Sequence, residues 1–116
     1  MKIDQNLLPN GLLLLSIDGD LDASSSMLMD EVIVDALQNQ QYQILINCGR
    51  LNYISSAGLG VFVSHRDSLL QQNGALVFYN MNERVYNIFE LLGLHNIFNI
   101  VPNEHDARKF FAYETN

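Results

Sequence analysis

The sequence predicts an α/β fold, a single domain over residues 1–116 in which about four helices pack on a mixed sheet of about four to five strands. The length of 116 residues is that of one ordinary domain, and 48% of them are apolar, which is enough for a buried core. Short apolar runs alternate with segments of helical periodicity, and polar clusters separate them. The expected order is β-β-α-β-α-β-α-β-α, with right-handed crossovers between parallel strands.

The first 40 residues predict a hairpin followed by a helix. A weak strand pattern covers residues 2–7, and Pro9-Asn10-Gly11 is a turn signal because Asn-Gly tolerates positive φ. A second strand is expected from Leu12 to Ile17, and residues 18–26 form a loop rich in helix-capping residues. An amphipathic helix is expected at about 24–39, because apolar residues recur there at helical spacing: Met29, Val32, Ile33, Ala36 and Leu37.

The rest of the chain predicts three further strand–helix pairs. Gln43 to Cys48 is a nearly continuous apolar run, typical of a strand covered on both faces, and a loop of residues 49–55 follows it. Further strands are expected at 75–79 and 97–101, and further helices at about 56–72, about 83–92 and around Ala107, Phe110 and Phe111. On the helix at 56–72 the small residues form one stripe, which predicts that this stripe lies close to the sheet: Ala57, Gly60, Val61, Ser64 and Ser68.

Composition and charge exclude several classes of function. The formal net charge is −7, and such an acidic surface repels nucleic acids and anionic membranes. The single cysteine, Cys48, excludes an intrachain disulfide and a zinc site built from thiolates, and it fits a reducing compartment. The longest apolar run, Leu12 to Leu15, is too short to cross a bilayer, and the N-terminus has no signal-peptide pattern. We therefore expect a soluble cytoplasmic protein without membrane insertion.

The segment Asn47 to Gly60 carries the most information about function. It predicts a strand, a loop and a helix that begins with two serines and two glycines, although each glycine costs roughly 1 kcal/mol relative to alanine in a helix. Glycines there would let another body approach the backbone closely. The first turn of a helix accepts negative charge, so a phosphate on Ser56 would be tolerated. The alternative is that Ser56 is simply the N-cap of the helix.

These residues resemble those of the STAS domain family, the family of bacterial anti-sigma factor antagonists. The resemblance covers nearly the whole chain and rests on Gly19-Asp20-Leu21-Asp22, on the strand Ile-Leu-Ile-Asn-Cys and on Tyr53-Ile54-Ser55-Ser56-Ala57-Gly58-Leu59-Gly60. The family pattern is often Asp-Ser-x-Gly-Leu-Gly, in which the serine is phosphorylated, and Ser56 matches that serine. Ser55 stands where the family often has aspartate, and Asn47 stands where an aspartate often ends the strand.

The resemblance implies a switch. The unphosphorylated protein would bind an anti-sigma factor that is also a serine kinase, and a sigma factor would be released. Phosphorylation of Ser56 would end the interaction, and a metal-dependent serine phosphatase would reset it. The implied partner surface combines residues of two loops: Asp20, Asp22, Ser24, Ser55, Ala57, Gly58 and Leu59. The alternative is a constitutive interaction module, either a scaffold or an accessory subunit of a transport complex, without phosphorylation.

Other candidate sites are weaker. Asp18, Asp20 and Asp22 alternate like the start of a calcium loop, but the glycine and the glutamate that such a loop requires are missing. His65 lies more than about ten ångströms along the helix from Ser56, too far to act as its base. We therefore expect a binding protein rather than an enzyme, with no metal and no cofactor. One of Met27 and Met29 is expected to be buried, as are Phe62 and Cys48, the latter as an apolar filler.

Overall fold

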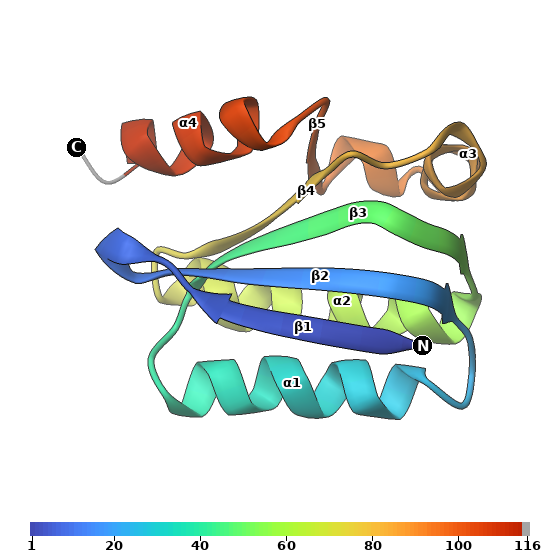
Figure 1. Ribbon diagram of the computed structural model, residues 1–116, viewed down its shortest axis with the longest axis horizontal. Helices are drawn as coiled ribbons and strands as arrows, with labels where there is room; N and C mark the ends of the chain where they lie inside the picture. The colour runs from blue at the N-terminus through green and yellow to red at the C-terminus, as the bar shows by residue number, and fades with distance from the viewer. Residues whose placement is uncertain (115–116) are drawn as a thin grey trace.

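Five strands form one mixed sheet in the order β1-β2-β3-β4-β5, with β1 antiparallel to β2 and the other neighbours parallel. The computed structural model describes residues 1–114, and their side chains as far as residue 112. The fold class and the order of elements predicted from the sequence are confirmed (Figure 1). The strands and helices are β1 (Lys2–Leu7), β2 (Leu12–Leu21), α1 (Ser26–Gln38), β3 (Gln43–Ile54), α2 (Ser56–Gln71), β4 (Ala75–Tyr79), α3 (Glu83–Leu91), β5 (Asn99–Val101) and α4 (Glu104–Glu114).

Strands β2 and β3 are longer than the sequence predicts. Both continue through segments expected to be loops, and they pair with each other from Asp18↔Arg50 as far as Leu21↔Ile54. Their pairing is irregular there, with register shifts between Ser16 and Asp18 and between Gly19 and Asp20. The loop predicted at 18–26 is confined to residues 22–25, and the loop predicted at 49–55 is strand as far as Ile54. Both predictions failed in part because polar residues and glycine are typical of loops. The two strands extend because they form hydrogen bonds with each other, and local residue preferences do not indicate such pairing.

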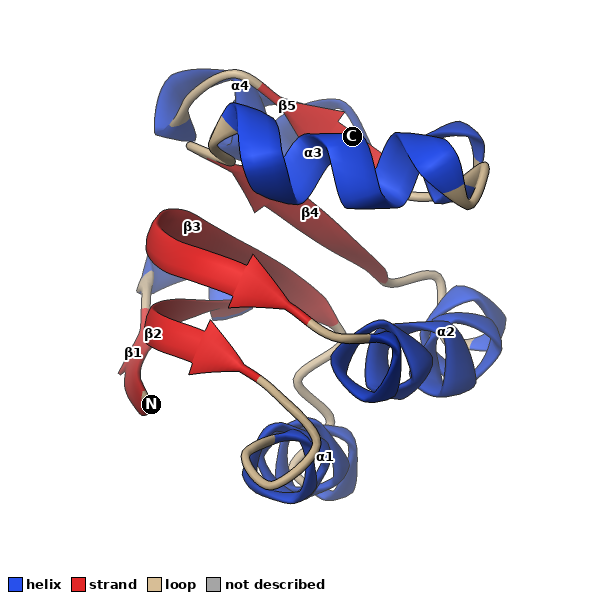
Figure 2. Ribbon diagram, turned by 90° about the vertical axis from the view of Figure 1, so that its right-hand side faces the viewer, coloured by secondary structure: helices blue, strands red, loops and turns tan. Residues whose placement is uncertain are grey.

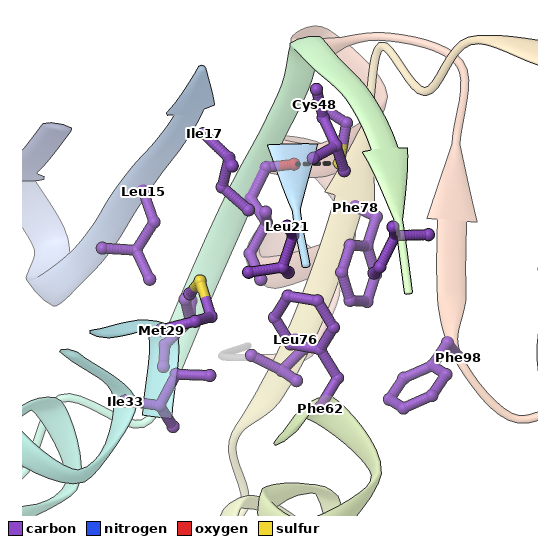
Figure 3. Close-up of a cluster of buried hydrophobic side chains, with 14 of the residues drawn as sticks. Leu15, Ile17, Leu21, Met29, Ile33, Cys48, Phe62, Leu76, Phe78 and Phe98 are labelled. Carbon is purple, nitrogen blue, oxygen red and sulfur yellow. Dashed lines mark hydrogen bonds between the residues drawn. The ribbon is translucent and has the colours of Figure 1, made fainter. Parts of the chain in front are cut away.

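One face of the sheet is covered by α1 and α2, and α3 adds to the same core. Alternate strand residues such as Leu15, Ile46 and Phe78 point into it, as strand geometry requires. Met29 and Phe62 come from the helices and are fully buried, as predicted (Figure 3). Phe78 lies at the centre, with its ring in edge-to-face contact with those of Phe62, Phe89 and Phe98 at centroid distances of 5.0, 5.5 and 5.6 Å.

The opposite face of the sheet is covered by α4. Ala107 and Phe111 of this helix pack on Leu45, Val77 and Tyr79. The Tyr79 hydroxyl donates a hydrogen bond to Glu104 Oε1 at 3.0 Å, and this links the start of α4 to the end of β4. In Figure 1, α4 lies above the strands and α1 below them, so the sheet is the middle layer of three.

The stripe of small residues on α2 was predicted to lie close to the sheet, but most of it does not. Ala57, Gly60, Ser64 and Ser68 are exposed, and of the predicted stripe only Val61 is partly buried against the core. Leu59, Phe62 and Leu69 form the buried face of the helix. The prediction was wrong because large apolar residues gain more from burial than small ones. The small residues Ala57, Gly60, Ser64 and Ser68 therefore lie on the outer side of α2, starting next to Ser56.

Candidate functional site

The two segments that carry the predicted site residues meet at one end of the sheet. The parallel strands β2 and β3 end side by side, and the Ser55 amide donates a hydrogen bond to the Leu21 carbonyl at 2.9 Å. The connection from β2 to α1 carries Asp22 and Ser24, and α2 begins directly after β3. Figure 2 looks onto this edge and shows both connections facing the viewer. The structure thus brings Asp20 and Asp22 next to the serine pair.

Ser55 and Ser56 have different roles at the start of α2. Ser55 is the N-cap: its backbone is extended (φ −90°, ψ 170°), and its hydroxyl oxygen accepts a hydrogen bond from the Gly58 amide at 3.2 Å. Ser56 is the first residue of the helix and is exposed, and its hydroxyl bonds to none of the described residues. The alternative interpretation of Ser56 as the N-cap is therefore wrong. The capping requirement is met by its neighbour, so the Ser56 hydroxyl is available.

Gly58 and Leu59 are buried, although both were predicted to contact a partner. Only 3% of the Leu59 surface is exposed, because its side chain belongs to the main core. A Cβ on Gly58 would come within 2.8 Å of Leu21 Cγ and 3.1 Å of Ile54 Cγ1. The body that approaches the Gly58 backbone is thus the protein's own core. Gly58 and Leu59 support the exposed residues Ser56 and Ala57 from behind.

The acidic loop before α1 is held together by Asp22. Its Oδ1 accepts hydrogen bonds from the Ser25 amide at 3.0 Å and from the hydroxyls of Ser24 at 2.8 Å and Ser25 at 3.0 Å. These bonds, the backbone one above all, lower the pKa of Asp22 from 3.8 to about 2, since each favours the charged carboxylate. The Asp20 carbonyl oxygen lies at 3.0 Å from the same Ser25 hydroxyl and is the alternative acceptor for its single proton. The predicted partner residues Asp22 and Ser24 therefore shape their own loop while remaining exposed.

The N-terminal third of the sequence is acidic, whereas the start of α2 carries no acidic side chain. Residues 1–40 contain seven of the 13 acidic residues and one basic residue, Lys2. The first turn of α2 holds no acidic side chain, and its amides have no partners within the helix. A single phosphate on Ser56 would be the only anion in that turn, where the positive end of the helix dipole favours it.

Large apolar side chains near the two loops were not predicted to belong to the site. Met27 is 70% exposed and Leu28 44% exposed in the first turn of α1, whereas Met29 is fully buried. Tyr53, near the end of β3, is 43% exposed. The signal for Leu28 is in the sequence: it is apolar, yet it falls outside the helical stripe of buried residues that runs from Met29 through Val32 and Ile33.

The surroundings of Ser56 do not resemble a catalytic site. His65 Nε2 lies 2.6 Å from Asp30 Oδ1, so the imidazole joins α2 to α1 and does not face Ser56. Among the side chains that the structure describes, those of residues 1–112, no cluster of histidine, cysteine, aspartate and glutamate has the geometry to hold a metal ion. A hollow of about 650 Å³ is lined by Pro9, Leu12, Arg108 and Phe111, at the opposite end of β2 from Ser56. None of the helices that the structure describes has the length and hydropathy to cross a bilayer.

Comparison with known proteins agrees with this architecture. The model of the STAS domain family matches residues 5–107. The chain belongs to the STAS domain family. The anti-sigma-B factor antagonist of Listeria monocytogenes is 30% identical over 84 residues, which cover 72% of this chain and 74% of that protein.

Solved STAS structures share the fold. The anti-sigma factor antagonist SpoIIAA in its unphosphorylated form superposes with a TM-score of 0.82 at 19% identity, covering 96% of both chains. Its phosphorylated form, from Bacillus, gives a TM-score of 0.73 at 18% identity, covering 95% of this chain and 99% of that one. A sulfate transporter family protein from Wolinella succinogenes gives 0.78 at 12% identity, covering 95% and 92%. The STAS fold thus occurs in proteins of different function.

Proposed function

We propose that this STAS domain is an anti-sigma factor antagonist whose partner binding is switched off by phosphorylation of Ser56. In the unphosphorylated state it binds an anti-sigma factor with serine kinase activity, so that a sigma factor is released. A metal-dependent serine phosphatase restores the unphosphorylated state. The observation that carries this proposal is the exposed Ser56 hydroxyl, which has no bonding partner among the described residues and lies at a helix start already capped by Ser55. The Listeria relative named as an anti-sigma-B factor antagonist supports the class of partner.

A phosphate at Ser56 would change the surface more than the fold. The phosphoserine adds about −1.5 to −2 charges at pH 7. The open amides and dipole of the first turn of α2 would stabilise it, so the helix start remains folded. At an interface, a like charge brought against the partner costs several kcal/mol, and each 1.4 kcal/mol lowers affinity about tenfold. One phosphate is therefore enough for a switch.

The proposed partner surface has an exposed layer and a supporting layer. The exposed layer combines side chains of both loops and of the first turn of α1: Asp20, Asp22, Ser24, Met27, Leu28, Ser56 and Ala57. Met27 and Leu28 add apolar contact beside the acidic loop, and methionine adapts readily to a partner surface. Ser55, Gly58 and Leu59 form the supporting layer. They fix the position of Ser56 and Ala57 and make little direct contact.

The two departures from the family pattern remove negative charge but keep the helix cap and leave the Ser56 hydroxyl free of side-chain partners among the described residues. Ser55 replaces an aspartate, and both residue types are good N-caps, so the capping bond to Gly58 is retained. Asn47 Oδ1 accepts hydrogen bonds from the Gly49 amide at 3.0 Å and from Asn80 Nδ2 at 3.4 Å. Its side chain thus stabilises the bend of β3 where β4 ends, and its partners do not include Ser56. We therefore expect Ser56 to remain a kinase substrate.

Phosphorylation by the cognate anti-sigma factor kinase tests the site. The chain is incubated with the kinase and ATP, and intact mass is measured for the wild type and for Ser56→Ala and Ser55→Ala. We expect one phosphate on the wild type and on Ser55→Ala, and none on Ser56→Ala. Equal labelling of Ser56→Ala would refute the assignment of the site.

Capture of the kinase tests the switch. Ser56→Asp should abolish capture and Ser56→Ala should retain it. Ser68→Asp is the matched control, because Ser68 is exposed on the same helix about 18 Å from Ser56 at 1.5 Å rise per residue. If Ser68→Asp is as damaging as Ser56→Asp, total charge rather than the Ser56 site controls binding. If neither aspartate variant affects capture, the chain is a constitutive module instead.

A further inference from the structure

The half of β3 that leads to Ser56 has a strand partner on only one side. β3 pairs with β4 from Gln43↔Ala75 to Asn47↔Tyr79, where β4 ends. Beyond this point β3 continues to Ile54 and pairs only with β2. Backbone groups on the free edge of a strand need other partners if they are not to depend on water. What holds this edge therefore affects the position of Ser56.

The side chain of Asn82 lies beside this free edge of β3 and bonds to it. It is the N-cap of α3, with an extended backbone, and its Oδ1 accepts a hydrogen bond from the Val85 amide at 2.8 Å. Its Nδ2 donates to the Leu51 carbonyl of β3 at 2.9 Å. One side chain thus caps a helix with its oxygen and binds the free edge of β3 with its nitrogen. The orientation of the amide is unambiguous, since only this one satisfies both bonds.

The two elements that the Asn82 side chain connects, α3 and β3, are both anchored in the core. Val85 and Phe89 of α3 are fully buried, and Leu51 belongs to the same core. α3 lies beside the far part of β3, as Figure 1 shows at the right of the molecule. From Leu51 the strand runs only a few residues further, through the buried Ile54, to the cap of α2. A shift of β3 at Leu51 would therefore move the start of α2.

We propose that Asn82 is a positioning residue: its amide ties the Leu51 carbonyl to α3 and so fixes the segment of β3 that presents Ser55 and Ser56. The positioning itself is inferred from the two hydrogen bonds of Asn82. Its effect on phosphorylation rests on the proposed function of Ser56. α3 thus supports the edge of β3 that β4 is too short to pair with. Recognition of Ser56 by the kinase would then depend on this support from α3.

Variants can separate the two bonds of Asn82. Asn82→Asp and Asn82→Ser keep an oxygen that can cap α3, but neither can donate to the Leu51 carbonyl as the amide does. Asn103→Asp is the matched control. Asn103 caps α4 through its Oδ1, which accepts a hydrogen bond from the Asp106 amide at 2.9 Å. Its side-chain nitrogen donates no hydrogen bond to any of the described residues. The same change is thus made at a cap unrelated to β3.

Hydrogen exchange of the whole chain, followed by mass spectrometry, measures the link without any partner. In both Asn82 variants we expect amides of residues 51–59 to exchange about fivefold faster, the effect of losing one hydrogen bond. Peptides from α4 should be unchanged, and Asn103→Asp should leave residues 51–59 unchanged. Unaltered exchange of residues 51–59 in the Asn82 variants would overturn the proposal.

The rate of Ser56 phosphorylation by the cognate kinase supplies the functional readout. Asn82→Asp and Asn82→Ser should raise the KM for this substrate about fivefold, whereas Asn103→Asp should match the wild type. Faster exchange with an unchanged KM would show a structural bond with no positioning role and would also overturn the proposal. Failure of the proposed function is distinguishable, because the wild type itself would then not be phosphorylated at Ser56.

Discussion

At the scale of single residues, the close approach of Gly58 to Leu21 and Ile54 fixes the first turn of α2. Gly58→Ala should destabilise the protein by about 1–3 kcal/mol, because the added methyl group overfills a closed core. Gly60 lies on the same helix, and a Cβ there would meet nothing within 4 Å. Gly60→Ala should therefore stabilise the helix by about 0.5–1 kcal/mol. Urea denaturation of both variants measures this difference, and equal effects would contradict the assigned role of Gly58.

Cys48 gives a second prediction for a single residue. It is 1% exposed, and burial raises the pKa of its thiol from 9.0 to about 12. Iodoacetamide at pH 8 should therefore modify the native protein far more slowly than the chain in urea.

The same thiol predicts a pH dependence of stability. Above pH 9 the unfolded chain loses the Cys48 proton while the folded chain keeps it, so the contribution of this group to stability is present below pH 9 and decreases towards pH 12. Cys48→Ala should flatten the alkaline fall in the free energy of unfolding. An equally steep fall in Cys48→Ala would show that other groups cause it.

At the scale of elements, α2 depends on the Ser55 cap. Ser55→Ala removes the acceptor of the Gly58 amide and should cost about 1 kcal/mol, whereas Ser56→Ala should leave the free energy of unfolding nearly unchanged. Chemical denaturation of the two variants compares adjacent serines in one helix. A larger loss for Ser56→Ala would mean that Ser56, rather than Ser55, caps the helix.

The elements also show what the sequence can and cannot predict. Helices α1 and α3 were predicted nearly to their ends, because large apolar residues such as Ile33 and Phe89 recur at helical spacing. The last parts of β2 and β3 were not, since Asp18 and Gly49 favour loops locally and only strand pairing overrides them. The predicted strand at 97–101 begins only at Asn99, because Leu94–Asn96 forms a 3₁₀ turn and Phe98 enters the core.

The candidate site was also predicted only in part, because local sequence patterns do not show contacts between distant segments. The identity of Ser56 as the available serine follows from motif resemblance, but which serine caps α2 depends on backbone geometry. Burial of Gly58 could not be predicted from the motif, because it depends on the approach of Leu21 from another strand. The link from Asn82 to Leu51 joins residues 31 positions apart, which local patterns do not reveal.

At the scale of the whole molecule, β2 and β3 end and α1 and α2 begin at the same end of the three-layered fold (Figure 2). Ser56, the acidic loop and the exposed side chains of Met27 and Leu28 therefore lie at this end. The core beneath them is continuous from α1 to α3. The proposed switch requires such a packed core beneath the site, because phosphorylation has to change the surface and leave the fold in place.

The most direct test of the phosphorylation switch compares the phosphorylated and unphosphorylated chain in two measurements, thermal unfolding and affinity for the anti-sigma factor kinase. We predict free energies of unfolding within about 1 kcal/mol of each other, because the start of α2 accommodates the anion. We predict an affinity at least about 100-fold lower for the phosphorylated chain. Equal affinities, or a loss of affinity that follows from unfolding of the phosphorylated chain, would contradict this account.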